Sequence, residues 1–145
     1  MHNASESSLD RFVTAQDRNY DHAVAEIKSG RKRSHWMWYI FPQLDGLGFS
    51  STARFYAIRD LAEAKAYFAH PILGPRLIAA TEAVLGVEGK SAEEIFGHPD
   101  YVKFRSCATL FAQVSATGSV FERALKKFYE GKPDEQTLTL LRNVA

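Results

Sequence analysis

Hydrophobic residues recur along the chain at the three- and four-residue intervals of an α-helix. No segment shows the alternation of apolar and polar residues that is typical of a half-buried strand. The pattern predicts an all-α fold, a compact single-domain bundle of about seven to nine short helices with no significant sheet.

Polar and helix-breaking residues divide this pattern into separate helices. The first apolar face begins at Leu9 and is expected to end near Asp17. A second helix is expected from Tyr20 to Gly30, because glycine is a common C-terminal stop.

Later helix starts are marked by side chains that can accept hydrogen bonds from free backbone N–H groups. Asp60 with Glu63, and Ser91 with Glu94, have the spacing of a capping box. Asp100 is expected to cap a longer helix. Other apolar faces predict helices within residues 51–58, 75–85, 119–130 and 134–141.

The segment 30–48 joins a basic run to an aromatic-rich turn that contains both tryptophans. Ser34 is expected to cap this turn, and Pro42 to end it, because proline lacks an N–H and restricts the residue before it. Trp36 and Trp38 cannot share one helix face at this spacing, so one is expected in the core and the other beside a groove. The residues expected to face the core are Trp36, Met37, Ile40 and Phe41.

The basic run itself has two interpretations. Lys28, Arg31, Lys32 and Arg33 place positive charge at the end of one helix and the start of the next. They are either a solvated surface that complements the helix dipole, or a contact to phosphate or carboxylate helped by free N–H groups at 34–36. The sequence leaves both open.

The composition favours a single globular domain without a membrane span. The chain has 145 residues, 46% of them hydrophobic, which suits one helical domain over 9–145 after a polar, flexible tail at 1–8. No apolar run has the length of a signal peptide or a membrane span. Cys107 is the only cysteine and lies on an apolar helix face, as a core thiol would. We expect a cytoplasmic protein with no membrane contact.

The charge balance limits the partners. There are 18 basic and 17 acidic residues, giving a formal net charge of +1, which disfavours nucleic acid. The five histidines lack metal-binding spacing, and the glycine-containing segments lack the glycines of phosphate- or dinucleotide-binding motifs. No metal and no cofactor are expected.

Polar residues among the aromatic ones form the candidate site. Trp38 or Tyr56 would stack on a flat ring, and Gln43, after a rigid Phe-Pro, is suited to fixed hydrogen bonding. His35 and Asp100 are the best candidates to move a proton, although catalysis itself stays uncertain. The basic residues of the candidate site would pair with an anionic group of the ligand. The candidate ligand-binding residues are Arg33, His35, Trp38, Gln43, Arg54, Tyr56, Arg76, Lys103 and Ser106.

Four motifs resemble those of a known family. They are Ser-His-Trp-Met-Trp-Tyr-Ile-Phe-Pro-Gln with a following Gly-Leu-Gly at 34–48, His-Pro-x-Leu-Gly-Pro-Arg-Leu at 70–77, Ile-Phe-Gly-x-x-Asp at 95–100 and Lys-x-x-Ser-x-x-Thr-Leu-Phe at 103–111. Over about residues 9–141 the chain resembles a family of small bacterial and fungal proteins of unknown function, sometimes labelled calpastatin. The resemblance implies an all-helical domain and no established activity. True calpain inhibitors of that name are disordered and repetitive, unlike this aromatic-rich chain.

Two classes of function remain. We favour a domain that binds or processes an anionic, ring-containing small molecule, of nucleotide or nucleotide-sugar type, in a pocket lined by Trp, His and Arg. The alternative is a non-catalytic protein–protein interaction module, in which an aromatic groove beside the basic run docks a peptide or partner helix. The sequence identifies neither the ligand nor a protein partner.

Overall fold

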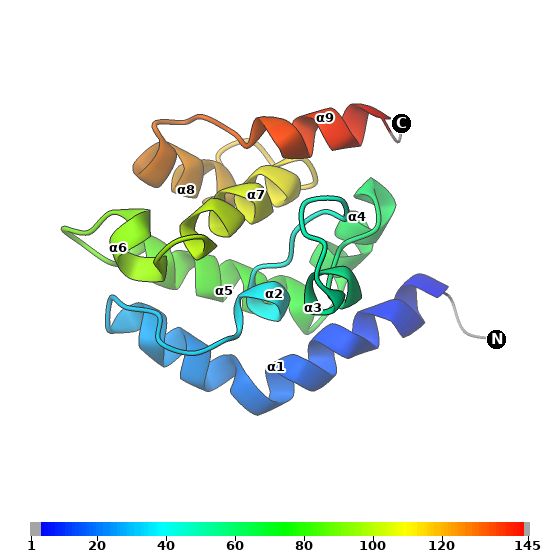
Figure 1. The fold of residues 1–145 in the computed structure, drawn as a ribbon, viewed down its shortest axis with the longest axis horizontal. Coiled ribbons are helices and arrows are strands. Elements are labelled where there is room, and N and C mark those ends of the chain that lie inside the picture. The colour runs from blue at the N-terminus through cyan, green and yellow to red at the C-terminus, as the bar shows by residue number, and fades with distance from the viewer. Residues whose placement is uncertain (1–3, 144–145) are drawn as a thin grey trace.

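The computed structural model describes residues 4–143, where helices are joined by loops (Figure 1). Within these residues the only β pairing is one parallel bridge between Leu44 and Ile58. The all-α prediction is therefore confirmed. The helices are α1 (Ala4–Lys28), α2 (Met37–Ile40), α3 (Ser51–Phe55), α4 (Leu61–Ala69), α5 (Leu73–Leu85), α6 (Ala92–Phe96), α7 (Asp100–Ala112), α8 (Val120–Tyr129) and α9 (Glu135–Asn143).

The helices form layers around α5 and α7. In Figure 1, α1 runs along one edge of the molecule and α9 along the opposite edge. Between them, α5 packs against α1, α4 and α8, and α7 packs against α4, α6, α8 and α9. The short α2 packs against α1 and lies within the segment 30–48, which we call the central segment.

The core is filled largely by aromatic rings. Phe41 lies edge-on to Phe104 at a centroid distance of 4.9 Å, and Phe96 stacks on Phe104 at 4.9 Å. Such ring pairs add to the stabilisation that comes from burial alone. The largest fully buried side chains include Trp36, Tyr67, Phe12, Phe41, Phe104, Phe111 and Phe121.

The central segment meets most expectations. Its four expected core residues are buried, and Trp38 is half-buried, so the two tryptophans divide as predicted. The prediction that Ser34 caps the turn is wrong. The N-cap position of α2 is Trp36, without a side-chain cap, and the Ser34 hydroxyl instead donates to Glu26.

α1 is one continuous helix where two were expected, so the predicted break near Asp17 is wrong. No glycine or proline interrupts the helix, and its polar residues around Asp17 are exposed on its surface. On the opposite face Gln16 is buried, and its Nε2 donates to the Tyr39 carbonyl (2.7 Å) and to the Tyr67 hydroxyl oxygen (3.0 Å). A polar residue on α1 thus forms hydrogen bonds inside the core.

The start of α1 differs from the predicted flexible tail at residues 1–8. α1 begins at Ala4, so the helix includes residues 4–8, for which a flexible tail was expected. Residues 1–3 lie outside the described residues, and flexibility there stays a prediction. None of the helices within 4–143 is both long and apolar enough to cross a membrane.

Of the four expected caps, those at Asp60 and Ser91 are present, whereas those at Ser34 and Asp100 are not. Asp60 accepts a hydrogen bond from the Glu63 amide at 2.9 Å, and Ser91 forms a full capping box with Glu94. Asp100 does not cap its helix, because it is already the first residue of α7. Its carboxylate turns instead to lysine side chains.

Candidate functional site

One buried carboxylate, Glu26, fixes the central segment to α1. Its Oε1 accepts hydrogen bonds from the backbone N–H groups of Arg33 (2.8 Å) and Ser34 (3.0 Å) and from the indole of Trp36 (2.9 Å). Its Oε2 accepts from the Ser34 hydroxyl at 2.6 Å. Burial raises the pKa of Glu26, but these hydrogen bonds to the charged form outweigh it and lower the pKa to about 2.

This carboxylate changes the interpretation of the basic run. The sequence suggested that free N–H groups at 34–36 could bind the phosphate of a ligand. The N–H groups of Arg33 and Ser34 are instead satisfied by Glu26, an anion from the same chain. The Ser34 N–H is therefore not free for a ligand anion.

His22 lies beside the same carboxylate but is not arranged for catalysis. Its Nε2 is 2.9 Å from Glu26 Oε2 and 3.3 Å from Ser34 Oγ. In a Ser-His-acid triad the histidine contacts the serine and the acid through different ring nitrogens. Here one nitrogen faces both groups, and the His22 side chain is 64% exposed. The contact holds the segment rather than activating the serine.

Asp100 lies between two ammonium groups. Lys32 Nζ is 2.8 Å from Asp100 Oδ2, and Lys103 Nζ is 3.4 Å from Asp100 Oδ1. The side chain of Lys32 is only 8% exposed and that of Lys103 is 23% exposed. We call these three residues the lysine cluster. Lys32 also donates to the Ser34 carbonyl. Two cations share one carboxylate, so the cluster carries a formal charge of +1 at a partly buried position.

Both lysines also lie over tryptophan rings. Lys32 Nζ is 5.1 Å from the ring centroid of Trp36, and Lys103 Nζ is 4.5 Å from that of Trp38. A ring face attracts a cation, so these contacts help to keep the ammonium groups in place. The buried pair anchors the cluster, whereas the pair of Lys103 and Trp38 is half-buried at the surface.

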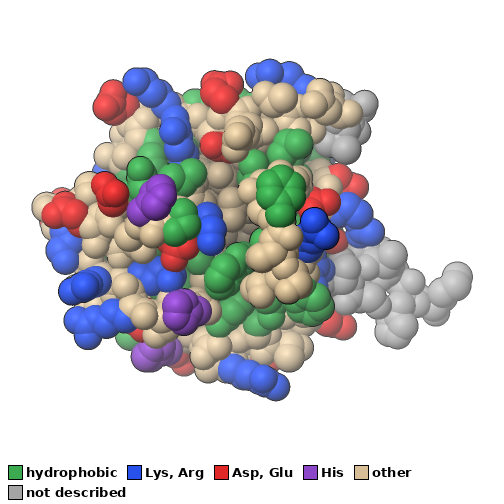
Figure 2. Space-filling model, in the orientation of Figure 1, with side chains coloured by type: hydrophobic (Ala, Val, Ile, Leu, Met, Phe, Trp, Pro, Cys, Tyr) green, Lys and Arg blue, Asp and Glu red, His purple; other side chains and the backbone are tan. Residues whose placement is uncertain are grey.

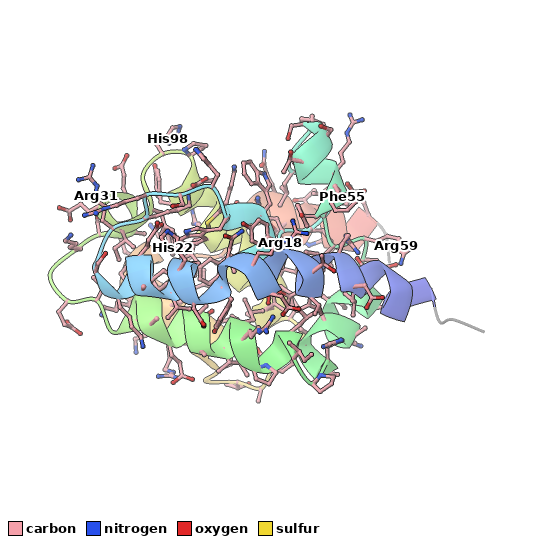
Figure 3. The ribbon with its side chains drawn as sticks, turned by 90° about the horizontal axis from the view of Figure 1, so that it is seen from below. Arg18, His22, Arg31, Phe55, Arg59 and His98 are labelled. Carbon is pink, nitrogen blue, oxygen red and sulfur yellow. The ribbon has the colours of Figure 1, made fainter. Side chains whose placement is uncertain are left out.

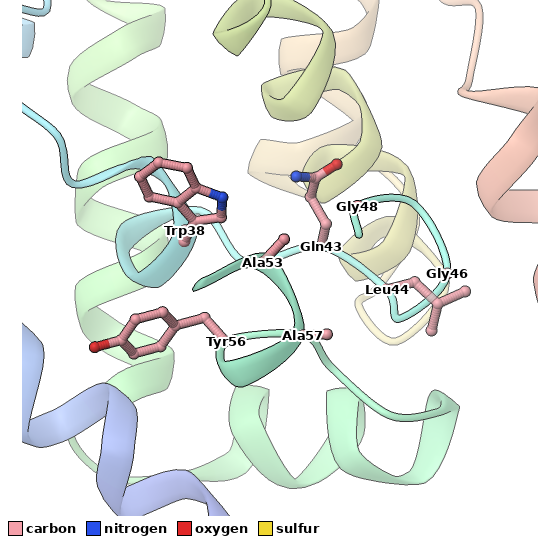
Figure 4. A pocket seen from close by; sticks show the side chains of 8 residues that line it. All are labelled: Trp38, Gln43, Leu44, Gly46, Gly48, Ala53, Tyr56 and Ala57. Atoms are coloured by element: carbon pink, nitrogen blue, oxygen red, sulfur yellow. The ribbon is translucent and has the colours of Figure 1, made fainter. Parts of the chain in front are cut away.

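A small pocket lies beside Trp38 (Figure 4). Figure 2 shows hydrophobic side chains gathered over α2 and α3 on this face, with Lys and Arg side chains beside them. Only about 10 Å³ of the pocket is open to the centre of a water-sized sphere, so it admits a small polar group and not a ring. It is lined by Trp38, Gln43, Leu44, Gly46, Gly48, Ala53, Tyr56 and Ala57.

Backbone contacts fix the pocket wall that carries Gln43. The Gln43 carbonyl accepts from the Ile58 amide at 2.8 Å. Gly48 lets the loop approach α3, because a Cβ at this position would lie 2.8 Å from the Ala53 Cβ. Among residues 4–143 no group hydrogen-bonds the side-chain amide of Gln43. Figure 4 shows the nitrogen edge of the Trp38 indole turned toward that amide.

The fold brings together five of the predicted site residues. Trp38, Gln43 and Tyr56 line the pocket, and Lys103 with Asp100 lies against the Trp38 ring. Trp38, Gln43 and Tyr56 lie in α2, the loop after it and the C-cap of α3, and the distant α7 adds Asp100 and Lys103.

The other predicted residues lie elsewhere. Ser106 is buried and donates to the Val102 carbonyl of its own helix at 3.2 Å. Arg76 forms an ion pair with Asp17 of α1 at 3.0 Å. Arg33 and His35 are exposed, and Arg54 lines a separate hollow, so none of these lines the pocket.

The sequence pattern did not indicate Glu26, and it indicated Lys32 only as one of four basic residues that could contact a phosphate or carboxylate. Glu26 lies in the last turns of α1, where an acidic residue is ordinarily a solvated one. Lys32 stands among three other basic residues, and only its exposed fraction distinguishes it from them. In the sequence, only the many N–H donors and aromatic rings of the central segment could have indicated that a carboxylate or an ammonium group is buried there.

The structure gives no support for metal or thiol chemistry. Among residues 4–143 no three His, Cys, Asp or Glu side chains are placed to hold a metal ion. Cys107 is 1% exposed, and burial raises the pKa of its thiol well above the ordinary value. The prediction of a core thiol is confirmed.

Comparison with known proteins identifies a family but no activity. The chain is similar to the conserved hypothetical protein Rv1873 from Mycobacterium tuberculosis, whose crystal structure matches with a TM-score of 0.90 and 49% sequence identity. That match covers 92% of this chain and 96% of the other. No curated protein matches the chain. A family model described as a protein of unknown function matches residues 6–141, and the chain therefore belongs to this family, DUF1810.

Proposed function

We propose that this protein binds a small anionic molecule with a planar ring at Trp38 and the lysine cluster. One observation carries the proposal: Lys32 and Lys103 share the single carboxylate of Asp100 beside a half-buried tryptophan. The excess positive charge favours an anion, because a partly buried cation is stabilised most by a charge that it can pair with.

The pocket sets how such a molecule would lie. Its ring is too large for the enclosed space and would lie against the open part of Trp38. Its anionic group would then meet Lys103, and a small polar group could reach the unpaired amide of Gln43. Nucleotides and nucleotide sugars combine these features.

The geometry favours binding over a reaction. Asp100 is held by two cations, which suits positioning them, and His35 is exposed outside the pocket. The interaction module expected beside the basic run has less support. In Figure 3, Arg31 of that run and the exposed Phe55 lie at opposite ends of the molecule.

The test uses the fluorescence of Trp38 and calorimetry with chosen probes. AMP, UDP-glucose and ADP-ribose combine charge and ring, whereas adenosine lacks the charge and pyrophosphate lacks the ring. We expect at least one combined probe to bind about tenfold more tightly than either partial probe, a difference of about 1.4 kcal/mol.

Three variants localise the binding. Trp38→Leu and Lys103→Gln should each weaken it about tenfold or more, since one loses the ring contact and the other the charge. Lys126→Gln, at an exposed position on α8, should leave it unchanged. Failure of every probe, or equal binding by Trp38→Leu and the unaltered protein, would contradict the proposal.

A further inference from the structure

The short helix α3 ends in an apolar side chain that does not pack into the core. None of its residues is buried, and Phe55 at its end is 57% exposed. Burying a phenylalanine side chain is worth about 1.5–3 kcal/mol, so an exposed one on a structured element is available to a partner.

The backbone at Phe55 is nevertheless held by hydrogen bonds, and its ring has one aromatic contact. Arg11 of α1 donates from Nε to the Phe55 carbonyl at 2.6 Å and from Nη2 to the Ala57 carbonyl at 2.8 Å. The Phe55 ring meets the Tyr56 ring edge-on at a centroid distance of 4.8 Å. A backbone that is already fixed loses little conformational freedom when a partner binds.

Two hollows flank this end of α3 and both reach Arg11. One, of about 470 Å³, is lined by Arg18, Phe55 and Tyr56 among others. The second, of about 460 Å³, is lined by Arg54, Arg59 and Glu63 among others. Figure 3 shows Phe55 between Arg18 and Arg59 in the view from below. We call Phe55 with the residues of both hollows the α3 surface.

The α3 surface is locally basic. Its residues include four arginines, Arg11, Arg18, Arg54 and Arg59, against the two carboxylates Asp45 and Glu63. Glu63 is only 2% exposed and pairs with Arg59 at 3.2 Å. By contrast, the guanidinium groups of Arg18 and Arg54 make no ion pair or side-chain hydrogen bond with the described residues. The surface therefore carries a formal charge of +2 in a chain of +1.

We propose that the α3 surface docks an acidic segment of a partner protein that carries an apolar side chain. The apolar side chain would cover Phe55, and carboxylates would pair with Arg18 and Arg54, whose planar fork matches a carboxylate. A peptide fits better than nucleic acid, because only a local patch and not the whole chain is basic. This site is separate from the lysine cluster and does not depend on it.

The experiment is a selection of random dodecapeptides displayed on phage against the immobilised protein. Phe55→Ala protein serves for counter-selection, and the binding of synthesised hits is measured by fluorescence polarisation. We expect the selected peptides to be rich in Asp or Glu together with Leu or Phe. Phe55→Ala and Arg54→Glu should each weaken them about tenfold or more, as for the central residues of an interface.

Phe49→Ala is the matched control. Phe49 is 75% exposed near the other end of α3 and lines a different hollow, against α9, so its loss should leave binding unchanged. Circular dichroism should show that all three variants fold, since each replaces an exposed side chain.

Four outcomes would overturn the proposal. They are selection of no peptides, selection of basic or uncharged ones, equal binding by Phe55→Ala, and loss of binding in Phe49→Ala. Tighter binding of a 20-residue oligothymidylate with a steep salt dependence would assign the surface to nucleic acid instead. A dimer in sedimentation that Phe55→Ala dissociates would assign it to a second copy of this chain.

Discussion

A single carboxylate, Glu26, performs within the chain the role that the sequence suggested for a ligand. It satisfies backbone N–H groups at Arg33 and Ser34 and holds the indole of Trp36. The indole N–H is buried and the two backbone groups are partly buried, so leaving them without partners would cost free energy. The position of Trp38 and of Lys32 in the site thus depends on a residue that contacts neither the pocket nor the lysine cluster.

Glu26→Gln should lower the stability of the protein. The amide keeps the size of the side chain but loses the charge, and its NH2 group replaces an oxygen that accepts hydrogen bonds. We therefore expect a loss of about 2–3 kcal/mol in the free energy of unfolding at pH 7. Urea denaturation followed by circular dichroism measures this. Glu82→Gln, at an exposed position on α5, should change it by less than about 0.5 kcal/mol.

The same carboxylate gives a pH dependence of known sign. The pKa of Glu26 is lowered from 4.5 to about 2 in the folded protein, so the unfolded chain binds the proton more tightly. Its stabilising contribution is complete above pH 4.5 and is lost as the pH falls toward 2. Between these limits the wild-type protein should lose more stability than Glu26→Gln. Equal losses would show that Glu26 is not held in its charged form.

At this scale the sequence predicts burial better than polar pairing. The division between Trp36 and Trp38 follows from helical geometry alone. The pairs of Glu26 with Ser34 and of Lys32 with Asp100 depend on how α1, the loop and α7 meet, which no local pattern encodes. Arg76 and Ser106 were chosen for their chemistry, but tertiary packing gave them other partners.

At the scale of elements, the contact of α4 with α5 depends on one glycine. Gly74 lies in the first turn of α5, where its amide donates to the His70 carbonyl at 3.1 Å. A Cβ at this position would lie 2.2 Å from the carbonyl oxygen of Phe68 in α4. Neither helix can yield locally, because the obstructing atom belongs to the backbone.

Gly74→Ala should therefore destabilise the protein by about 2 kcal/mol or more, even though alanine is the better helix former. Gly86→Ala is the matched control. Gly86 has a helical φ of −74°, and the nearest atom to its added Cβ would be 3.5 Å away. Replacing Gly86 with alanine should leave the stability unchanged or raise it slightly, because alanine lowers the conformational entropy of the unfolded chain. Similar melting temperatures for the two variants would contradict the close approach of α4 and α5.

Helix existence was predictable from the sequence, and the continuity of α1 was not. Caps at Asp60 and Ser91 act within a few residues, so their signals can be read locally. The run around Asp17 looks like a break because it is polar, yet Gln16 makes two buried hydrogen bonds there. Contacts with Tyr39 and Tyr67 from other parts of the chain favour the uninterrupted helix.

At the scale of the molecule, Tyr56 lies between two surfaces of different chemistry. It lines the narrow pocket with Trp38 and Gln43, and it also lines the hollow with Arg18 and Phe55. Both surfaces are locally positive in a chain that is nearly neutral overall. The two proposals therefore need separate variants, and Lys103→Gln and Arg54→Glu each change one surface while leaving the charge of the other intact.

The whole molecule is also expected to open as one unit, and Cys107 can report this. Its side chain lies within the layer around α7, 1% exposed, and burial raises the pKa of its thiol. A thiol reagent reacts with the exposed thiolate, so labelling requires opening of the core. Because α7 packs against α4, α6, α8 and α9, we expect that the departure of a single helix does not expose Cys107. The free energy of opening from native-state labelling with a disulfide reagent should equal the free energy of unfolding from urea denaturation. A labelling value lower by more than about 1 kcal/mol would instead show that part of this core opens independently.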